Sequence, residues 1–200
     1  MTGILGIQPN LPGFHFLSPQ IATHIWGHKV SGSRLFVAVY STHVEGELAI
    51  RKMQSLGLDM NRLSFVGRDY RTEDKALGRY QSNDRTRYWE NLGALGNGVW
   101  NLLSGVAFFY VPEMGPFLVG GPLASSTIGT LEGSTPVSGL SAIGSGLNII
   151  GIPKDKVHKY ERALKSGNHL VIAQGSEEEM AEVKAIVKRT DVLEFDLYGG

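Results

Sequence analysis

Three histidines near the N-terminus, His15, His24 and His28, are the residues whose type and spacing come nearest to a metal site. His24 and His28 are four residues apart, so an α-helix would place both on one face, as a pair of zinc ligands requires. No acidic residue occurs in residues 1–44 to complete or orient such a site. We therefore expect polar contacts here and assign no metal ligand.

Two glycine-rich segments, residues 93–98 and 144–146, resemble loops that cradle phosphate groups. A dinucleotide-binding loop follows a strand, opens a helix and has an acidic residue further along the chain. Neither segment has this context, so we expect no nucleotide or other cofactor.

Arginines and aromatic residues alternate between residues 68 and 89, a mixture that can bind anions or single-stranded nucleic acid. Nearby acids almost cancel the charge, and the whole chain has a formal net charge of zero. We expect a connector rich in salt bridges at a subunit or lipid-headgroup interface, and no nucleic-acid partner. The residues concerned are Arg68, Arg71, Arg79, Arg85, Arg87, Tyr70, Tyr80, Tyr88 and Trp89, with Asp69, Glu73, Asp74 and Asp84 as the acids.

Two isolated acids, Glu113 and Glu132, lie in apolar surroundings, which inside a lipid bilayer would mark a functional residue. Both stand beside predicted turns, where water can solvate a carboxylate, and Glu132 could instead pair with an arginine of a neighbouring subunit. No Ser-His-Asp arrangement and no pair of carboxylates can be argued from spacing. The sequence therefore predicts a protein that is not an enzyme.

The stretch between Arg87 and Lys154 contains no basic residue and only three acids, Glu90, Glu113 and Glu132. Thirteen of the 26 glycines lie between Gly93 and Gly151. Such a stretch has to be hidden from water, by lipid, by other copies of the chain or by its own domain.

The rest of the chain is ordinarily polar, and the whole chain of 200 residues contains no cysteine. Disulfides and thiolate metal sites are excluded, and a reducing cytosol is permitted. No secretory signal is recognisable at the N-terminus. We expect a cytoplasmic α/β domain, with the inner membrane as a second possible location.

Residues 1–32 contain three prolines and many large apolar side chains, which disordered tails seldom have. We expect an arm that docks on its own domain or on a neighbouring subunit. The anchors we expect are Phe14, Phe16, Ile25 and Trp26.

Two flanking segments, residues 33–87 and 154–200, each read as strands joined by a helix. The first has strands at 35–40 and 63–66 around a helix that begins with a capping box at Thr42 and Glu45. The second has a helix at 155–165, a strand at 169–173, a helix that begins at Ser176, and a final alternating strand at 192–197. Together they predict an α+β fold with a ferredoxin-like four-stranded sheet and helices on one face.

The insertion, residues 88–153, reads as three apolar helical segments at 91–111, 116–131 and 136–151. Small residues recur at helical spacing, as in helices whose backbones pack closely. If both flanks build one sheet, the number of membrane crossings must be even, which excludes three spans and leaves two spans or a hairpin with an interfacial helix. The residues expected to pack helices and drive oligomerisation are Gly93, Asn97, Asn101, Gly105, Gly129, Gly133, Ala142 and Gly146.

Several short motifs together resemble those of an uncharacterised bacterial general-stress-protein family, over roughly residues 35–190. They are Val66–Tyr70, Tyr88-Trp89 before Gly93-Ala94, Gly115-Pro116, Gly120–Leu123, Leu131–Gly133 and Gly151–Lys154. The resemblance implies a small α/β domain split by a glycine-rich hydrophobic stretch, and it implies no catalytic residue.

These observations favour a non-catalytic, stress-related protein that associates with itself through its glycine-rich helices, at the membrane. The partner is a second copy, in a closed oligomer or a filament, with the lipid bilayer as a further partner. Two alternatives stay open. One is a soluble filament or shell with the insertion as its dry core, and the other is a sensor of a small ligand.

Overall fold

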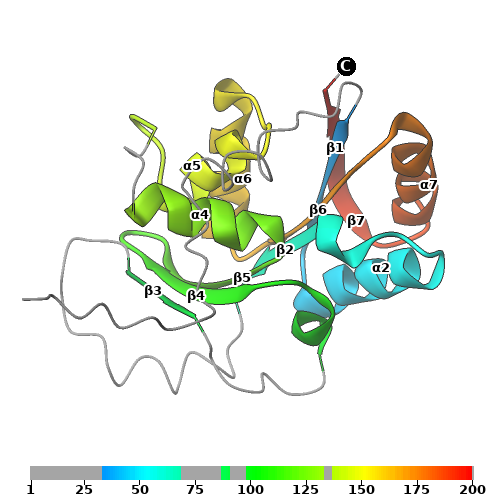
Figure 1. The fold of residues 1–200 in the computed structure, drawn as a ribbon, viewed down its shortest axis with the longest axis horizontal. Helices are drawn as coiled ribbons and strands as arrows, with labels where there is room; N and C mark the ends of the chain where they lie inside the picture. The colour runs from blue at the N-terminus through cyan, green and yellow to red at the C-terminus, as the bar shows by residue number, and fades with distance from the viewer. Residues whose placement is uncertain (1–32, 69–86, 91–97, 133–136, 200) are drawn as a thin grey trace, which may run out of the picture. The chain divides into compact units, whose positions relative to one another are not determined.

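A computed structural model describes residues 33–68, 87–90, 98–132 and 137–199 (Figure 1). Strands are β1 (Arg34–Tyr40), β2 (Leu63–Gly67), β3 (Arg87–Glu90), β4 (Val106–Val111), β5 (Gly115–Gly120), β6 (His169–Gly175) and β7 (Val192–Tyr198). Helices are α2 (His43–Ser55), α4 (Pro122–Glu132), α5 (Ala142–Ile149), α6 (Lys154–Lys165) and α7 (Glu177–Val187), with short 3₁₀ turns η1 (Met60–Arg62) and η2 (Val99–Leu102).

The strands of the described residues form one sheet in the order β3-β4-β5-β2-β6-β1-β7. Every neighbouring pair is antiparallel. Strand β1 lies between β6 and β7, and almost every residue of β1 is buried, as expected for a strand covered on both faces.

The prediction of a four-stranded ferredoxin-like sheet with helices on one face is wrong. The sheet has seven strands, and helices cover both of its faces. One hydrophobic core lies between the sheet and α4, α5 and α6, and includes Val37, Leu123, Ile143 and Tyr160. The other lies beneath α2, η2 and α7, and includes Phe36, Ile50, Trp100 and Val183.

The prediction that the insertion is a helical hairpin is also wrong. Residues 106–111 and 115–120 form the β4–β5 hairpin, and only the later part of the insertion is helical, in α4 and α5. The run Val106–Val111 is rich in β-branched and aromatic residues, which favour strands over helices. In the three-residue turn that follows, Glu113 has a positive φ of 63° and is exposed.

The apolar side chains of this stretch are hidden by the chain itself. Phe109 and Phe117 on the hairpin and Leu123 and Leu147 on the helices are fully buried in the first core. Among the described residues, no helix combines the length and the apolar character that crossing a bilayer requires.

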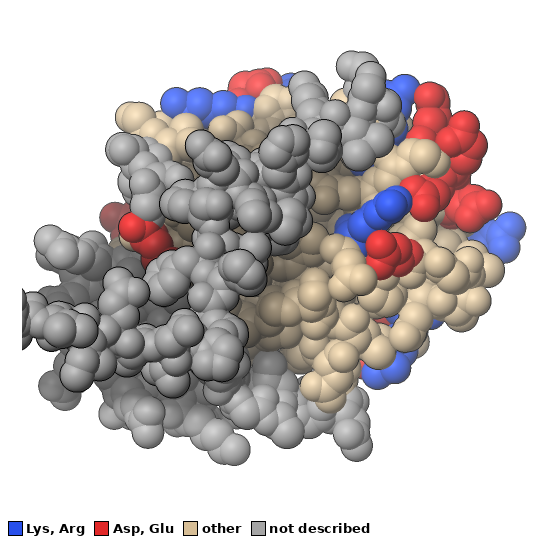
Figure 2. Space-filling model, viewed as in Figure 1, with Lys and Arg blue, Asp and Glu red and all other residues tan. Residues whose placement is uncertain are grey.

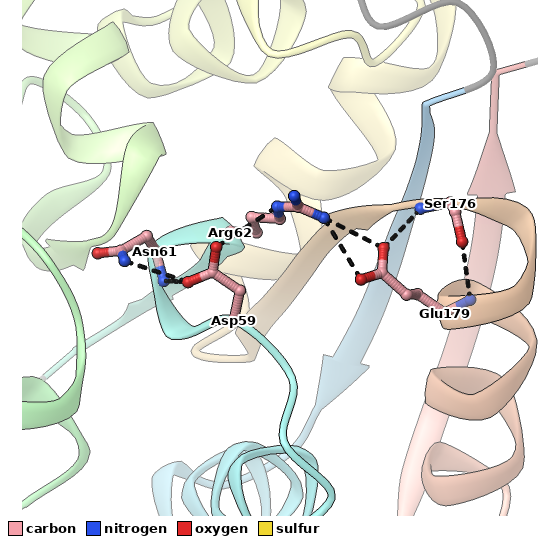
Figure 3. A network of polar contacts seen from close by, with 5 residues as sticks. All are labelled: Asp59, Asn61, Arg62, Ser176 and Glu179. Carbon is pink, nitrogen blue, oxygen red and sulfur yellow. Dashed lines mark hydrogen bonds and ion pairs between the residues drawn. The ribbon is translucent and has the colours of Figure 1, made fainter.

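The flanking helices begin where local chemistry predicts. Thr42 and Glu45 form the expected capping box at α2, and Ser176 and Glu179 form a second one at α7. Figure 3 shows that Glu179 also accepts from Arg62, at 3.2 Å between Nη1 and Oε2. This exposed network links the turn before β2 to the start of α7, whose residues Met180 and Val183 are buried against the sheet.

Candidate functional site

Strand β7 forms one edge of the sheet. It pairs with β1 along one side, and no other described strand pairs with its opposite side. A strand edge presents unpaired backbone N–H and C=O groups that can accept a further strand. The edge is seven residues long and contains neither proline nor lysine, two residues that commonly block such pairing.

Two leucines of β7 are exposed, Leu193 by 57% and Leu197 by 43%, whereas Phe195 stacks on Phe36 with ring centroids 5.4 Å apart. The pairing of β7 with β1 shifts register between Val39 and Tyr40, so Leu193 stands in a bulge where the alternation of faces is broken. Helix α7 packs on β1 and β6, and so does α2. The leucines at the two ends of β7 therefore lie beyond the cover that these helices provide.

One face of β7 carries acids held by α6. Lys159 forms ion pairs with Glu194, at 3.1 Å, and with Asp196. The hydroxyl of Tyr160 donates to Asp196 Oδ2 at 2.8 Å, and Tyr198 donates to Tyr160 at 2.7 Å between the two oxygens. A single lysine thus balances part of the negative charge at this edge.

The pKa values in this group follow from the contacts. Burial, with the hydrogen bonds to Tyr198 and Asp196, raises the pKa of Tyr160 far above its usual value, so this phenol stays protonated. Burial opposes ionisation of Asp196, but its bonds to Lys159 and Tyr160 outweigh this and lower its pKa. Burial likewise opposes the charge of Lys159, but Asp196 and Glu194 raise its pKa, so the pair is ionised at neutral pH.

A second cluster of polar and aromatic groups lies under α2. His43, at the start of α2, has its ring centroid 5.8 Å from that of His169 on β6 and 5.7 Å from that of Trp100 on η2. Phe65 on β2 contacts all three rings. His43 also lies 3.5 Å from a carboxylate oxygen of Glu47 one turn further along α2.

Two buried members of this cluster, His169 and Trp100, each have a polar atom that is not hydrogen-bonded. His169 Nε2 donates to the backbone carbonyl of Arg68 at 3.4 Å, which makes Nδ1 an acceptor in the neutral ring. Neither His169 Nδ1 nor Trp100 Nε1 has a hydrogen-bond partner within the described part of the chain. Burial, together with the charges of His43 and Arg68, lowers the pKa of His169, so the ring is neutral at pH 7.

Of the residues predicted to pack helices, some lie outside the described ranges, some lie in turns and some lie on helices. Gly93, Asn97 and Gly133 lie outside the described residues, as do the arm residues Phe14, Phe16, Ile25 and Trp26. Asn101 lies in η2, and Gly105 has a φ of 59° in the turn before β4, so the two do not share one face of an α-helix.

Ala142, Gly146 and Gly129 do lie on helices. Gly146 on α5 faces α4, where a Cβ would lie 2.4 Å from Thr127 Oγ1, so this glycine permits close packing inside the chain. Ala142 is buried on α5, and Gly129 on α4 is exposed, with nothing within 4 Å of the place of its Cβ. Of the three, only Gly129 stands where another molecule could contact it.

The metal and charge patterns considered in the sequence can be compared with the described residues. The ranges described contain no group of three or more side chains that could hold a metal ion, and His15, His24 and His28 lie outside them. On the face shown in Figure 2, the acidic and basic side chains that are described are interspersed around an uncharged area.

Sequence reasoning identified β7 as a half-exposed final strand but not as an edge, because the position of a strand in the sheet depends on pairing between distant segments. It missed the His43–His169 cluster for the same reason. Comparison of the chain with family models, with curated proteins and with solved structures finds no match.

Proposed function

We propose that this protein is a non-catalytic protein that works by associating with itself, and that β7 is the contact surface. The observation that carries the proposal is the open edge of β7, where Leu193 and Leu197 are exposed and Lys159 pairs with both Glu194 and Asp196. Paired strands would cover both leucines and satisfy the backbone groups of the edge.

The contact surface proposed here, the edge of β7, differs from the glycine-rich insertion that the sequence predicted. The insertion was expected to drive association because its apolar residues had to be hidden, but Phe117, Leu123 and Leu147 are buried in the chain's own core. We therefore place the contact between copies at the edge of the sheet and not at the glycine-rich helices. The resemblance to the bacterial general-stress-protein family supports a role in stress, as part of the same proposal.

Sedimentation velocity over a range of concentrations tests self-association. We expect the full chain to sediment as more than a monomer, and Leu193→Lys/Leu197→Lys to shift it to the monomer because edge lysines oppose strand pairing. Val44→Lys/Leu48→Lys is the matched control, since both residues are exposed and lie one turn apart on α2. A wild-type monomer at every concentration would refute the proposal, and a monomer only with the α2 variant would move the contact to α2.

The location at the cytoplasmic face of the inner membrane remains part of the proposal. Lys154 and Lys156 are exposed at the start of α6, where Asp155 pairs with Lys156 at 3.3 Å. Each basic residue near an anionic bilayer contributes about 1 kcal/mol of attraction, and an acid between two lysines offsets part of it. Flotation with vesicles rich in anionic lipid tests this location. Protein that rises with the vesicles at low salt and is released at high salt supports it, and protein that stays in the dense fractions contradicts it.

A ligand sensor is the second candidate function, favoured by the unpartnered atoms of Trp100 and His169. An indole N–H and an imidazole acceptor together suit a small uncharged molecule that carries both an acceptor and a donor, such as an alcohol or an amide. A screen of such compounds by thermal unfolding tests the idea, because a ligand that binds the folded state raises the unfolding temperature. Stabilisation that survives Trp100→Phe would contradict this site.

A further inference from the structure

The sheet has a second open edge, at β3. Strand β3 pairs with β4 on one side, and no other described strand pairs with its opposite side. All neighbouring pairs are antiparallel, and β3 and β7 are the first and the last of the seven strands, so these two edge strands run in the same direction. A second copy of the chain therefore offers the edge of β7 two different strands, its own β7 or its β3.

We propose that β7 of one copy pairs antiparallel with β3 of the next copy, so that one sheet continues from subunit to subunit in an open chain. The proposal rests on the self-association proposed above and names the second contact surface. Because the two surfaces differ, each added copy leaves a free β7 at one end of the assembly and a free β3 at the other. Antiparallel pairing requires the next copy to be turned over about an axis that crosses the strands, and this turn exchanges the two faces of its sheet.

The acids of β7 lie on the face of the sheet that α6 covers. Asp196 lies opposite Val37, and Glu194 lies opposite Val39. Both valines belong to the core beneath α4, α5 and α6. Lys159 supplies one positive charge for the two carboxylates, so a further base on this face would balance the second one.

The basic residue of β3 lies on the opposite face of its own sheet. In the pairing with β4, Arg87 lies opposite Tyr110 and Trp89 lies opposite Phe108, which belongs to the core beneath α2 and α7. Strand residues two apart share a face. When the next copy is turned over, its Arg87 therefore comes to the face of β7 that carries the two acids.

The register of this contact follows from the bulge in β7. The pairing with β1 is regular over Glu194–Tyr198 and shifts at Leu193. The four residues of β3 fit within this regular stretch, on the correct faces, when Tyr88 of the partner subunit lies opposite Leu197. Leu197, which is exposed on the separate subunit, is then covered. Arg87 of the partner subunit becomes a diagonal neighbour of Asp196, within reach of a long side chain.

Two other arrangements fit less well. Antiparallel pairing of β7 with a second β7 brings the acids of both copies to one contact, and it brings the bulge at Leu193 into both strands. Pairing of β7 with β3 without turning the next copy over makes the two strands parallel. It also places Glu90, which lies opposite Ala107 and so on the face of the first core, beside the acids of β7.

Disulfide trapping between two variants tests the contact, because the natural sequence contains no cysteine. We expect a mixture of Leu197→Cys and Tyr88→Cys chains to form a covalent dimer under mild oxidation, and neither variant to do so alone. In the matched control, Val44→Cys replaces Leu197→Cys, since Val44 is also exposed but lies on α2. Crosslinking no greater than in this control, in samples that associate, would overturn the pairing with β3 and leave self-association standing. Equal crosslinking of Leu197→Cys alone would overturn it as well.

Charge variants of Arg87 test the same contact by sedimentation velocity. We expect Arg87→Glu to shift the chain towards the monomer, because it adds an acid beside Asp196, whereas Arg87→Lys keeps the charge and should associate as the wild type does. A mixture of Arg87→Glu with Leu193→Lys/Leu197→Lys should form pairs, since the first keeps an intact β7 and the second keeps an intact β3. Unchanged association of Arg87→Glu, or a mixture that forms no pairs, would overturn the contact.

The size of the wild-type assembly distinguishes the possible failures. An open chain predicts a mass that rises past two subunits as the concentration increases. An assembly that stops at two subunits would overturn the pairing of β7 with β3 and leave self-association standing. A wild-type monomer at every concentration would refute both proposals.

Discussion

The imidazole of His169 occupies the space that a side chain at position 67 would need. A Cβ built on Gly67 would lie 2.1 Å from His169 Cδ2. The two residues are neighbours across the β2–β6 pair, in which Val66 lies opposite Leu170. Glycine at this position is therefore required by close approach, and it lets the ring reach Phe65 and His43.

Gly67→Ala should destabilise the fold, because the ring is packed on several sides and cannot move without disturbing its neighbours. We expect a loss of roughly 1–3 kcal/mol in the free energy of unfolding, the usual cost of overpacking a core. Urea unfolding measures it. Gly98→Ala is the control, since a Cβ there would meet only Trp100 Cδ1 at 3.8 Å, and equal effects of the two variants would show that His169 does not confine position 67.

Acid should weaken the fold through His169. Its pKa is lowered in the folded state by burial and, to a smaller extent, by the charges of His43 and Arg68, while the hydrogen bond to the Arg68 carbonyl and the charge of Glu45 oppose this shift. Between the usual histidine pKa, about 6.5, and the lowered value, the unfolded chain binds more protons than the folded one. The free energy of unfolding therefore falls as the pH falls through this window.

The variant His169→Gln tests this dependence, because its amide keeps a donor for the Arg68 carbonyl but does not titrate. Urea unfolding at a series of pH values should give a shallower slope for the variant than for the wild type below about pH 6.5. Identical slopes would mean that His169 does not contribute to the acid response.

Two helical glycines should respond in opposite ways to alanine. Gly146→Ala should lower stability by roughly 1–3 kcal/mol, because its Cβ would press on Thr127 and Leu123. Gly129→Ala should raise the stability of the isolated subunit by roughly 0.5–1 kcal/mol, because alanine favours a helix and the site is open. Thermal or urea unfolding checks both, and destabilisation by Gly129→Ala would show that this surface is occupied.

Asp196→Asn should loosen the contact between α6 and β7. The variant loses the carboxylate that pairs with Lys159 and accepts from Tyr160. Because the site is partly exposed, we expect a loss of about 1 kcal/mol at pH 7.

The acid response of Asp196 supplies a second readout. The folded-state pKa of this residue is lowered, so its contribution is present above the usual aspartate pKa, about 3.9, and is lost as the pH falls through the lowered value. The wild type and the Asn variant should therefore converge in stability in acid. A constant difference down to low pH would contradict the role of the ionised carboxylate.

The sequence predicted the flanking elements well because their signals are local. The strands around Val37 and Ile172 are runs of β-forming residues, and the helix starts at Thr42 and Ser176 are set by side chains three residues away. It misread the insertion because glycines four apart resemble a helix-packing pattern. Gly105 serves a turn instead, whereas Gly146 uses its small size between α5 and α4.

The candidate interface could not be predicted in the same way. The alternation in Val192–Tyr198 indicated a half-exposed strand, but its place at the edge follows from pairing with β1, which is about 150 residues earlier in the sequence. How exposed Leu193 and Leu197 are depends on where α7 and α2 lie over the sheet, and no local sequence pattern determines that.

Hydrogen exchange of the β7 backbone, measured in dilute and in concentrated solution, tests the central claim most directly. Backbone N–H groups of β7 that point away from β1 should exchange quickly in dilute solution and become protected as the concentration rises, while β1 amides stay protected throughout. Peptides that cover Val192–Tyr198 report this difference, with Leu193→Lys/Leu197→Lys as the sample that should show no change. Exchange in β7 that is the same at every concentration would contradict strand pairing between copies of the chain.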